Sequence, residues 1–252
     1  MNLIMQAADI LLPYRCGICG GCSDASGKIG QLEAIYGRLY GEAAGIHVCG
    51  KCLSELVPQP RDRRWFTCLS NPLNDDPAPD LTLYVPFSYS GVVDKAVPRI
   101  KFSGRYEIAR LFGILLAAEL LSEGIEFDMI VPVPLNPKRF KERGFNQAFE
   151  IAYPVSRLSG RMIADNVLLR NKETRRQSEL IKTQDRMLNV SGAFAFNPEW
   201  DITGNRVLLI DDVATSGHTL RECALTLLGN GADSVLCCAF AGNRQIKNDE
   251  PF

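Results

Sequence analysis

The segment 207–219 restricts the possible folds of this chain more than any other part of it; it reads Val-Leu-Leu-Ile-Asp-Asp-Val-Ala-Thr-Ser-Gly-His-Thr. Its apolar start, 207–210, is short and rich in branched residues, which is typical of a strand buried on both faces of a parallel sheet. Two acids and a small hydroxylated turn follow. In open α/β sheets, ligands bind beyond the carboxyl ends of the strands, where the next helix directs free amides toward an anion. The segment therefore predicts an α/β fold with an anion site after this strand.

The polar residues of this segment suit a sugar phosphate. Asp211 and Asp212 can accept hydrogen bonds from the vicinal hydroxyls of a ribose. The turn that follows offers hydroxyl donors and a glycine that lets the backbone come close to a phosphate. The candidate phosphate-binding residues are Thr215, Ser216, Gly217, His218 and Thr219. The alternative is that the acids and hydroxyls only cap the next helix, and we expect His218 to be a loop side chain rather than a catalytic base.

Four cysteines near the N-terminus form two Cys-x-x-Cys pairs, Cys16 with Cys19 and Cys49 with Cys52. Two such pairs can present four thiolates to one tetrahedral ion, and zinc is the ion that this ligand set favours. Cys22 extends the first pair and is an alternative ligand to Cys19. The chain has nine cysteines in all, which point to metal binding or buried thiols in a reducing, cytoplasmic setting rather than to disulfides.

Alternating strands and helices are expected after this cysteine module. Residues 70–80 are rich in proline and aspartate and lack periodicity, so we place a boundary near residue 78, with a small module at 1–78 and a larger domain at 79–252. Alternation in the larger domain predicts a parallel sheet with helices on both faces. We expect a half-exposed strand at 81–89, further strands at 128–133, 207–210 and 234–241, and helices at 106–121, 146–158 and 219–228. Three further cysteines on these elements are expected to be buried thiols: Cys223, Cys237 and Cys238.

Charge and hydropathy narrow the class of protein. The formal net charge is −1, so the chain lacks a globally basic surface, and any contact with nucleic acid must come from local patches. We expect no membrane span, because no apolar run approaches the roughly 18 residues that one requires. The N-terminal stretch has no Lys or Arg before Arg15, and it therefore lacks the positive flank of a secretory signal.

Several separate segments, taken in order, resemble the ComF family of ComFC- and GntX-like proteins. The strand, acid pair and loop at 207–219 are similar to the phosphoribosyl pyrophosphate (PRPP) signature of type I phosphoribosyltransferases. Before it come the two cysteine pairs, then Tyr89-Ser90-Gly91, Lys101-Phe102-Ser103-Gly104, Val131-Pro132-Val133-Pro134 and Arg143-Gly144-Phe145-Asn146-Gln147-Ala148, and finally Gln177, Leu180, Arg186, Asn189 and Phe194. The likeness extends over nearly the whole chain.

This resemblance implies a zinc-ribbon module followed by a type I phosphoribosyltransferase-like parallel sheet. It implies that Asp211 and Asp212 position the ribose and stabilise an oxocarbenium-like state. Mg²⁺ would bridge the pyrophosphate and the sugar. A loop after the 128–133 strand would hold the pyrophosphate through Arg139 and Arg143.

Surface charge is the alternative reading of the neighbouring Lys138 and Lys141. A second basic loop, 171–176, is expected either to close over the ligand or to be a plain surface loop.

Three functions remain open from the sequence. The first is transfer of phosphoribosyl from PRPP to an unidentified nitrogen acceptor. The second, implied by the family's link to competence and DNA utilisation, is an accessory that handles single-stranded DNA or contacts the DNA-uptake machinery. The third is a regulator that senses PRPP without turnover. All three would use the same ligand loop, so the sequence does not separate them.

Overall fold

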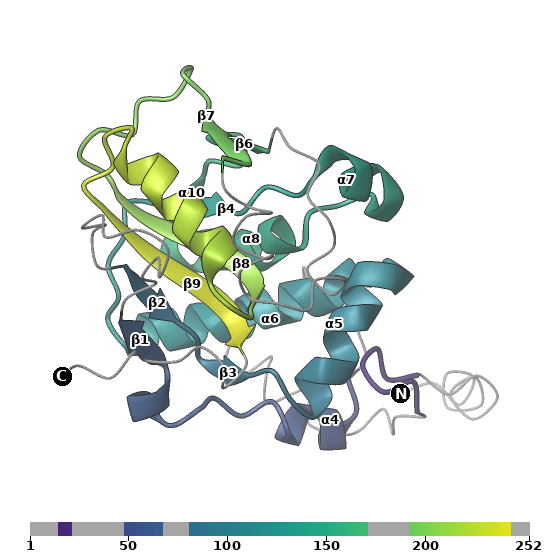
Figure 1. Cartoon of the computed structure of the whole chain (residues 1–252). Coiled ribbons are helices and arrows are strands. Elements are labelled where there is room, and N and C mark those ends of the chain that lie inside the picture. Colours follow the sequence, from purple (N-terminus) through teal and green to yellow (C-terminus); the bar gives the residue numbers. More distant parts are fainter. Residues whose placement is uncertain (1–14, 22–47, 68–80, 171–191, 243–252) are drawn as a thin grey trace.

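The computed structural model describes residues 15–21, 48–67, 81–170 and 192–242 (Figure 1). A seven-stranded sheet runs in the order β1-β2-β9-β8-β4-β5, with β3 also paired to β9. Every pairing in it is parallel except that of β1 with β2. The strands of this sheet are β1 (Trp65–Thr67), β2 (Thr82–Tyr84), β3 (Phe87–Ser88), β4 (Met129–Pro132), β5 (Met162–Ile163), β8 (Arg206–Ala214) and β9 (Ser234–Gly242).

A two-stranded antiparallel sheet and the helices complete the described part of the chain. The small sheet pairs β6 (Leu168–Arg170) with β7 (Phe194–Phe196). The helices are α4 (Gly50–Ser54), a 3-10 turn (Arg61–Arg63), α5 (Val92–Ser103), α6 (Tyr106–Ser122), α7 (Pro137–Arg143), α8 (Gln147–Ser159) and α10 (His218–Leu228).

Two hydrophobic cores lie on opposite faces of the central strands. Successive strand residues point to opposite faces, so Leu208 and Phe240 pack with α5, α6 and α8. Leu209 and Ala239, one residue along, pack with α10. Figure 1 shows α10 in front of the sheet and α6 behind it. The predicted parallel sheet with helices on both faces is therefore confirmed.

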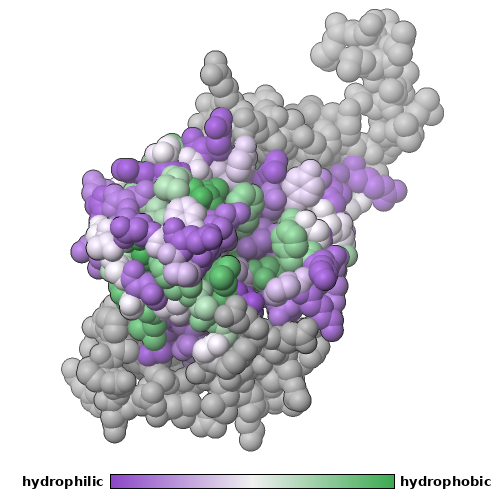
Figure 2. Space-filling model, turned by 90° about the horizontal axis from the view of Figure 1, so that it is seen from above, coloured by the Kyte–Doolittle hydropathy of each residue, from purple (hydrophilic) through white to green (hydrophobic). Residues whose placement is uncertain are grey.

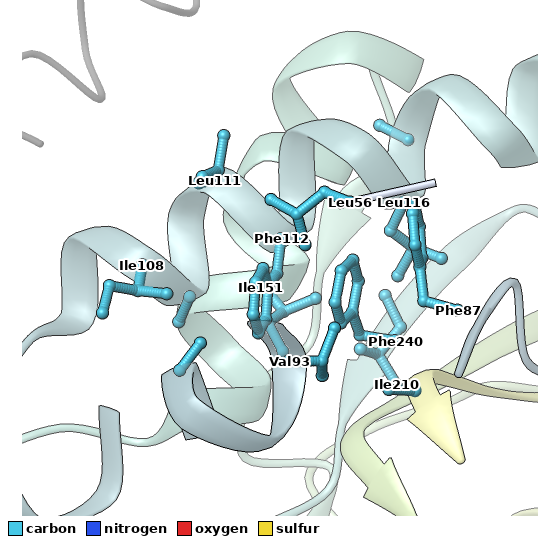
Figure 3. Close-up of a cluster of buried hydrophobic side chains, with 14 of the residues drawn as sticks. Leu56, Phe87, Val93, Ile108, Leu111, Phe112, Leu116, Ile151, Ile210 and Phe240 are labelled. Carbon is cyan, nitrogen blue, oxygen red and sulfur yellow. The ribbon is translucent and has the colours of Figure 1, made fainter. Parts of the chain in front are cut away.

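Aromatic stacking fills the first core (Figure 3). The rings of Phe112 and Phe240 are 3.9 Å apart between centroids and nearly parallel, at 8°. Phe87 stacks on the other side of Phe240 at 4.4 Å. Gly113 lies against Ile151 and Pro154, where a Cβ atom would clash. The absence of a side chain at Gly113 thus lets α6 pack closely on α8 beside Pro154, which lies inside that helix.

Most predicted elements are confirmed to within a residue or two, and three predictions are wrong. The half-exposed strand at 81–89 is instead two short strands that are largely buried, because β2 lies between β1 and β9. The strand expected at 207–210 continues to Ala214, since β9 pairs with it as far as Gly242. The acid pair therefore lies within the strand rather than after it.

The third difference concerns the basic loop after β4, which contains the helix α7. The Asn136 side chain caps this helix by accepting from Lys138 N at 2.9 Å. Pro137 at the first helical position and Gly144 in the left-handed conformation, with φ 80°, mark its two ends. These are ordinary helix signals, and they mark where α7 begins and ends.

The cysteine module packs on the core of the larger domain. Ile18, Val48 and Leu56 belong to the same buried cluster as α5 and α6. Arg99 Nη1 of α5 donates to Gly17 O at 3.2 Å. The boundary near residue 78 stays a prediction, because 68–80 lies outside the described residues.

Several predicted features cannot be placed, namely Cys22, the 171–176 loop and the residues 177–189 of the family resemblance, which lie outside the described ranges. Within those ranges, none of the helices combines the length and the apolar character needed to cross a bilayer. On the face drawn in Figure 2, apolar residues form small groups among hydrophilic ones.

Candidate functional site

A cavity of about 350 Å³ lies where β4 and β8 end. Its lining comes from α5, the segment from β4 through α7 to the start of α8, β6, β8 and the start of α10. Six of the nine predicted ligand-binding residues line it: Arg139, Arg143, Asp211, Asp212, Thr215 and Thr219. The other three, Ser216, Gly217 and His218, lie in the same segment between the two threonines but are not among the lining residues. The structure therefore brings the acid pair and the α7 arginines to one place.

The acid pair lies near the end of β8. Asp212 is only 8% exposed, and its backbone N–H donates to Asp211 Oδ1 at 2.8 Å. Burial and the neighbouring Asp212 carboxylate raise the pKa of Asp211 to about 7. Lys101 Nζ of α5 lies 2.6 Å from Asp212 Oδ2. Asp212 is thus paired with a cation, whereas Asp211 retains acceptor capacity for a ligand hydroxyl.

The turn at the start of α10 brings amide and hydroxyl donors to the cavity wall. Gly217 is the N-cap of α10, with φ 72° and no capping side chain, so the first amides of the helix lack the usual side-chain acceptor. Ser216 Oγ is buried without a hydrogen-bond partner. Thr215 and Thr219 flank this turn on the cavity wall. The first amides of the helix, its dipole and the hydroxyl donors together suit a phosphate group. His218 is the first residue of α10 rather than part of a loop.

Two cations line the cavity in addition to those predicted from the sequence. Lys101 belongs to a segment quoted only for its resemblance, and Arg170 ends β6. The Arg170 guanidinium lies over the Phe194 ring at 5.1 Å, and burial, with the nearby charge of Arg139, lowers its pKa. The Arg143 guanidinium lies 5.8 Å from the ring centre of Phe102.

Gln147 is a further residue of the cavity without an assigned role. It is the first residue of α8, it is 4% exposed, and it lies on the cavity wall. Its Oε1 atom is buried without a hydrogen-bond partner. A buried amide oxygen of this kind is costly unless something donates to it, so Gln147 can accept from a ligand.

The predicted cysteine cluster is formed. The sulfur atoms of Cys16, Cys19, Cys49 and Cys52 all lie within 4.8 Å of one another. Cys19 Sγ and Cys49 Sγ are 3.8 Å apart, which is close to the edge of a tetrahedron with Zn–S bonds of about 2.3 Å.

Backbone amides surround these sulfur atoms. Cys16 Sγ accepts from the N–H groups of Cys19 at 3.5 Å and Cys49 at 3.3 Å, and Cys49 Sγ accepts from Cys52 N at 3.5 Å. Burial raises the pKa of Cys16, but these amides outweigh burial and lower it to about 6. Cys16 therefore favours the thiolate, which is the form that binds a metal, whereas burial and the neighbouring cysteines raise the pKa of Cys52.

Comparisons with known proteins relate this chain to a family. The model of the phosphoribosyl transferase domain matches residues 158–250. Competence protein F of Haemophilus influenzae is 28% identical over 87% of both chains. A solved glutamine PRPP amidotransferase from B. subtilis shares 21% identity over 50% of this chain and 24% of its own, with a TM-score of 0.35. The DNA utilization protein YhgH of Salmonella typhimurium is 34% identical over 87% of both chains. Given this last likeness over most of its length, the protein belongs to the ComF family of competence and DNA utilization proteins.

Proposed function

We propose that this protein binds PRPP or a related ribose phosphate in the cavity at the end of β8. The observation that carries the proposal is the meeting of three groups on one wall: the acid pair, the uncapped start of α10 and the arginines of α7. Asp211 and Asp212 would hold the ribose hydroxyls. The segment 215–219 would hold the 5′-phosphate, and Arg139 and Arg143 would hold the pyrophosphate.

This arrangement supports transfer of the phosphoribosyl group to a nitrogen acceptor. In that reaction the nitrogen attacks the anomeric carbon and pyrophosphate leaves with the bonding electrons. The carboxylates of Asp211 and Asp212 would orient the ribose and stabilise the positive charge that develops on it. Bound Mg²⁺ would supply charge to the pyrophosphate oxygens, which are the hard ligands that this ion prefers.

Calorimetry with ribose 5-phosphate and PRPP tests the proposed ligand. Arg143→Ala should lower the affinity for PRPP by about tenfold, because a charge-assisted contact to the pyrophosphate is lost. Its affinity for ribose 5-phosphate, which has no pyrophosphate, should change little. Thr219→Val should lower the affinity for both ligands, since a donor near the shared 5′-phosphate is removed. Lys141→Ala is the matched control, because Lys141 is exposed on the same helix and is not a lining residue. A wild type without affinity for any phosphorylated ribose would refute the proposal.

We also propose that the cysteine cluster holds one structural zinc ion. Support comes from the four close sulfur atoms and the amides that donate to them. A bound zinc would tie together two segments that are distant in the sequence. A site of this kind needs reduced thiols, which supports the expected cytoplasmic location.

A second candidate function is contact with single-stranded DNA. Phe102 is 69% exposed and Phe140 is 49% exposed, and both lie near the cations of α7 and the cavity. Exposed aromatic rings beside cations can stack nucleic-acid bases, and the names of two relatives refer to DNA utilization and competence.

Fluorescence anisotropy with a labelled oligonucleotide at two salt concentrations tests DNA contact. Steep salt dependence, with loss of binding in a Phe102→Ala, Phe140→Ala double variant, is the expected result. A parallel assay for pyrophosphate release separates the roles. PRPP binding without release, whatever amine or base is added, would identify a PRPP-sensing regulator.

A further inference from the structure

The helix α5 covers one side of the cavity and delivers a cation to the acid pair. Val93, Ala96 and Ile100 bury one face of this helix in the core. Val97, Pro98 and Lys101 line the cavity from the adjacent face. Lys101 Nζ ends 2.6 Å from Asp212 Oδ2, so the two side chains form an ion pair.

The ion pair is largely shielded from solvent. The side chain of Lys101 is 25% exposed and that of Asp212 is 11% exposed, so water screens their attraction less than at an open surface. The Lys101 charge also acts on Asp211 and on Tyr89. One ammonium group therefore lies beside the two carboxyl groups of this corner of the cavity.

We propose that Lys101 is a built-in cation of the ribose phosphate site and determines its metal requirement. Its ammonium group occupies the place beside Asp212 that a divalent cation would take, so the free protein excludes such a cation from the acid pair. A ribose phosphate then binds without a metal on Asp211 and Asp212, and any Mg²⁺ enters on the pyrophosphate of the ligand. The part of the proposal that concerns ribose phosphate rests on the function proposed above. The exclusion of a divalent cation from the acid pair does not depend on that function.

The arrangement differs from that of a lysine that only supports its own helix. Lys101 lies in the last turn of α5. A lysine side chain that stayed beside this helix end would interact favourably with the helix dipole. The Lys101 ammonium group instead contacts a carboxylate on β8, a different element. Lys95 on the same helix is exposed and does not line the cavity; it is therefore a matched control.

Titration with Mn²⁺, followed by electron paramagnetic resonance, tests the exclusion directly. Wild type and Lys95→Met should bind no Mn²⁺ at the acid pair. Adding Asp212→Asn to either protein should therefore leave its Mn²⁺ binding unchanged. Lys101→Met should gain one Mn²⁺ site at the acid pair, with a dissociation constant of about 10⁻⁴–10⁻³ M, the range of weak carboxylate sites. Lys101→Arg retains the charge and should exclude the ion like the wild type. Mn²⁺ binding by the wild type at the acid pair, or no gain in Lys101→Met, would overturn the proposal.

Calorimetry with ribose 5-phosphate, with and without Mg²⁺, tests the consequence for the ligand. The wild-type affinity should change less than about twofold on adding Mg²⁺, whereas Lys101→Met should lose about tenfold without Mg²⁺ and recover most of it with the ion. Equal metal dependence in the two proteins would overturn the metal requirement that we assign to Lys101. If no protein binds ribose 5-phosphate, the proposed function fails, and the Mn²⁺ titration alone decides the inference. Circular dichroism checks that Lys101→Met remains folded.

Discussion

Asp211→Asn should make the free protein more stable at alkaline pH while removing its affinity for ribose phosphate. Burial and the Asp212 carboxylate raise the pKa of Asp211 from 3.8 to about 7 in the folded protein. Between these two values the folded chain retains a proton that the unfolded chain has lost. The stability that this carboxyl contributes is therefore complete below about 3.8 and is lost as the pH rises through about 7. Asparagine does not titrate, so the unfolding free energy of the variant does not fall in this way as the pH rises.

The size of the effect follows from the two pKa values. One pKa unit corresponds to about 1.4 kcal/mol, and the full shift predicts that raising the pH from about 5 to about 8 destabilises the wild type by about 3 kcal/mol relative to the variant. Asp211 is partly exposed, so solvent screening should reduce the difference to about half of that value.

Urea unfolding at the two pH values measures this difference. The controls are wild type and Asp165→Asn, since Asp165 is an exposed carboxylate away from the cavity. The gain in unfolding free energy of Asp211→Asn over wild type should be larger at the higher pH, and Asp165→Asn should show no such trend. Calorimetry on the same preparations should show that Asp211→Asn no longer binds ribose 5-phosphate. An Asp211→Asn gain that is equal at both pH values would refute the argument, because an unperturbed carboxyl gives no pH-dependent difference.

Three further predictions concern the metal, the core and the phosphate turn. Metal analysis should find about one zinc per chain in the wild type and a clear loss in Cys49→Ser; unchanged zinc would exclude the proposed ligand set. Phe240→Ala should reduce the unfolding free energy by about 3–5 kcal/mol, since it removes the central ring of a stack. The exposed Val57→Ala is the control, and similar losses in both would contradict the packing. Gly217→Ala should cost about 1–2 kcal/mol, because its φ of 72° disfavours a side chain, and it should weaken ribose 5-phosphate; an unaltered melting temperature would argue against this backbone conformation.

Much of the fold was predictable because its signals are local. The strand at β4 and the helices α6, α8 and α10 follow from apolar patterns and from the residues that end them. The extension of β8 to Ala214 was not predictable in this way, because it depends on pairing with β9. The helix α7 has local signals in Asn136, Pro137 and Gly144 for a cap, a start and a stop, but the predicted pyrophosphate contacts Arg139 and Arg143 were expected on a loop.

The candidate site was predicted in part for the same reason. The acid pair and the turn before α10 are adjacent in the sequence, so a single motif identifies them. Lys101 and Arg170 come from elements about 110 and 41 residues before Asp211, and only the folded chain places them on the same wall. Gln147 was visible only as part of a family string, because its buried, unpartnered oxygen is a property of the packed structure.

The helix α5 connects the cysteine module with the cavity. Arg99 donates to the backbone of the first cysteine pair, and Lys101, two residues later, contacts the acid pair. The helix contains Pro98, which removes one internal hydrogen bond, so its position depends more on packing than on its own propensity. Residues of the cysteine module supply part of that packing through the shared core. A metal-bound module would therefore help to hold Lys101 at the site, which gives a physical reason for one chain to carry both parts.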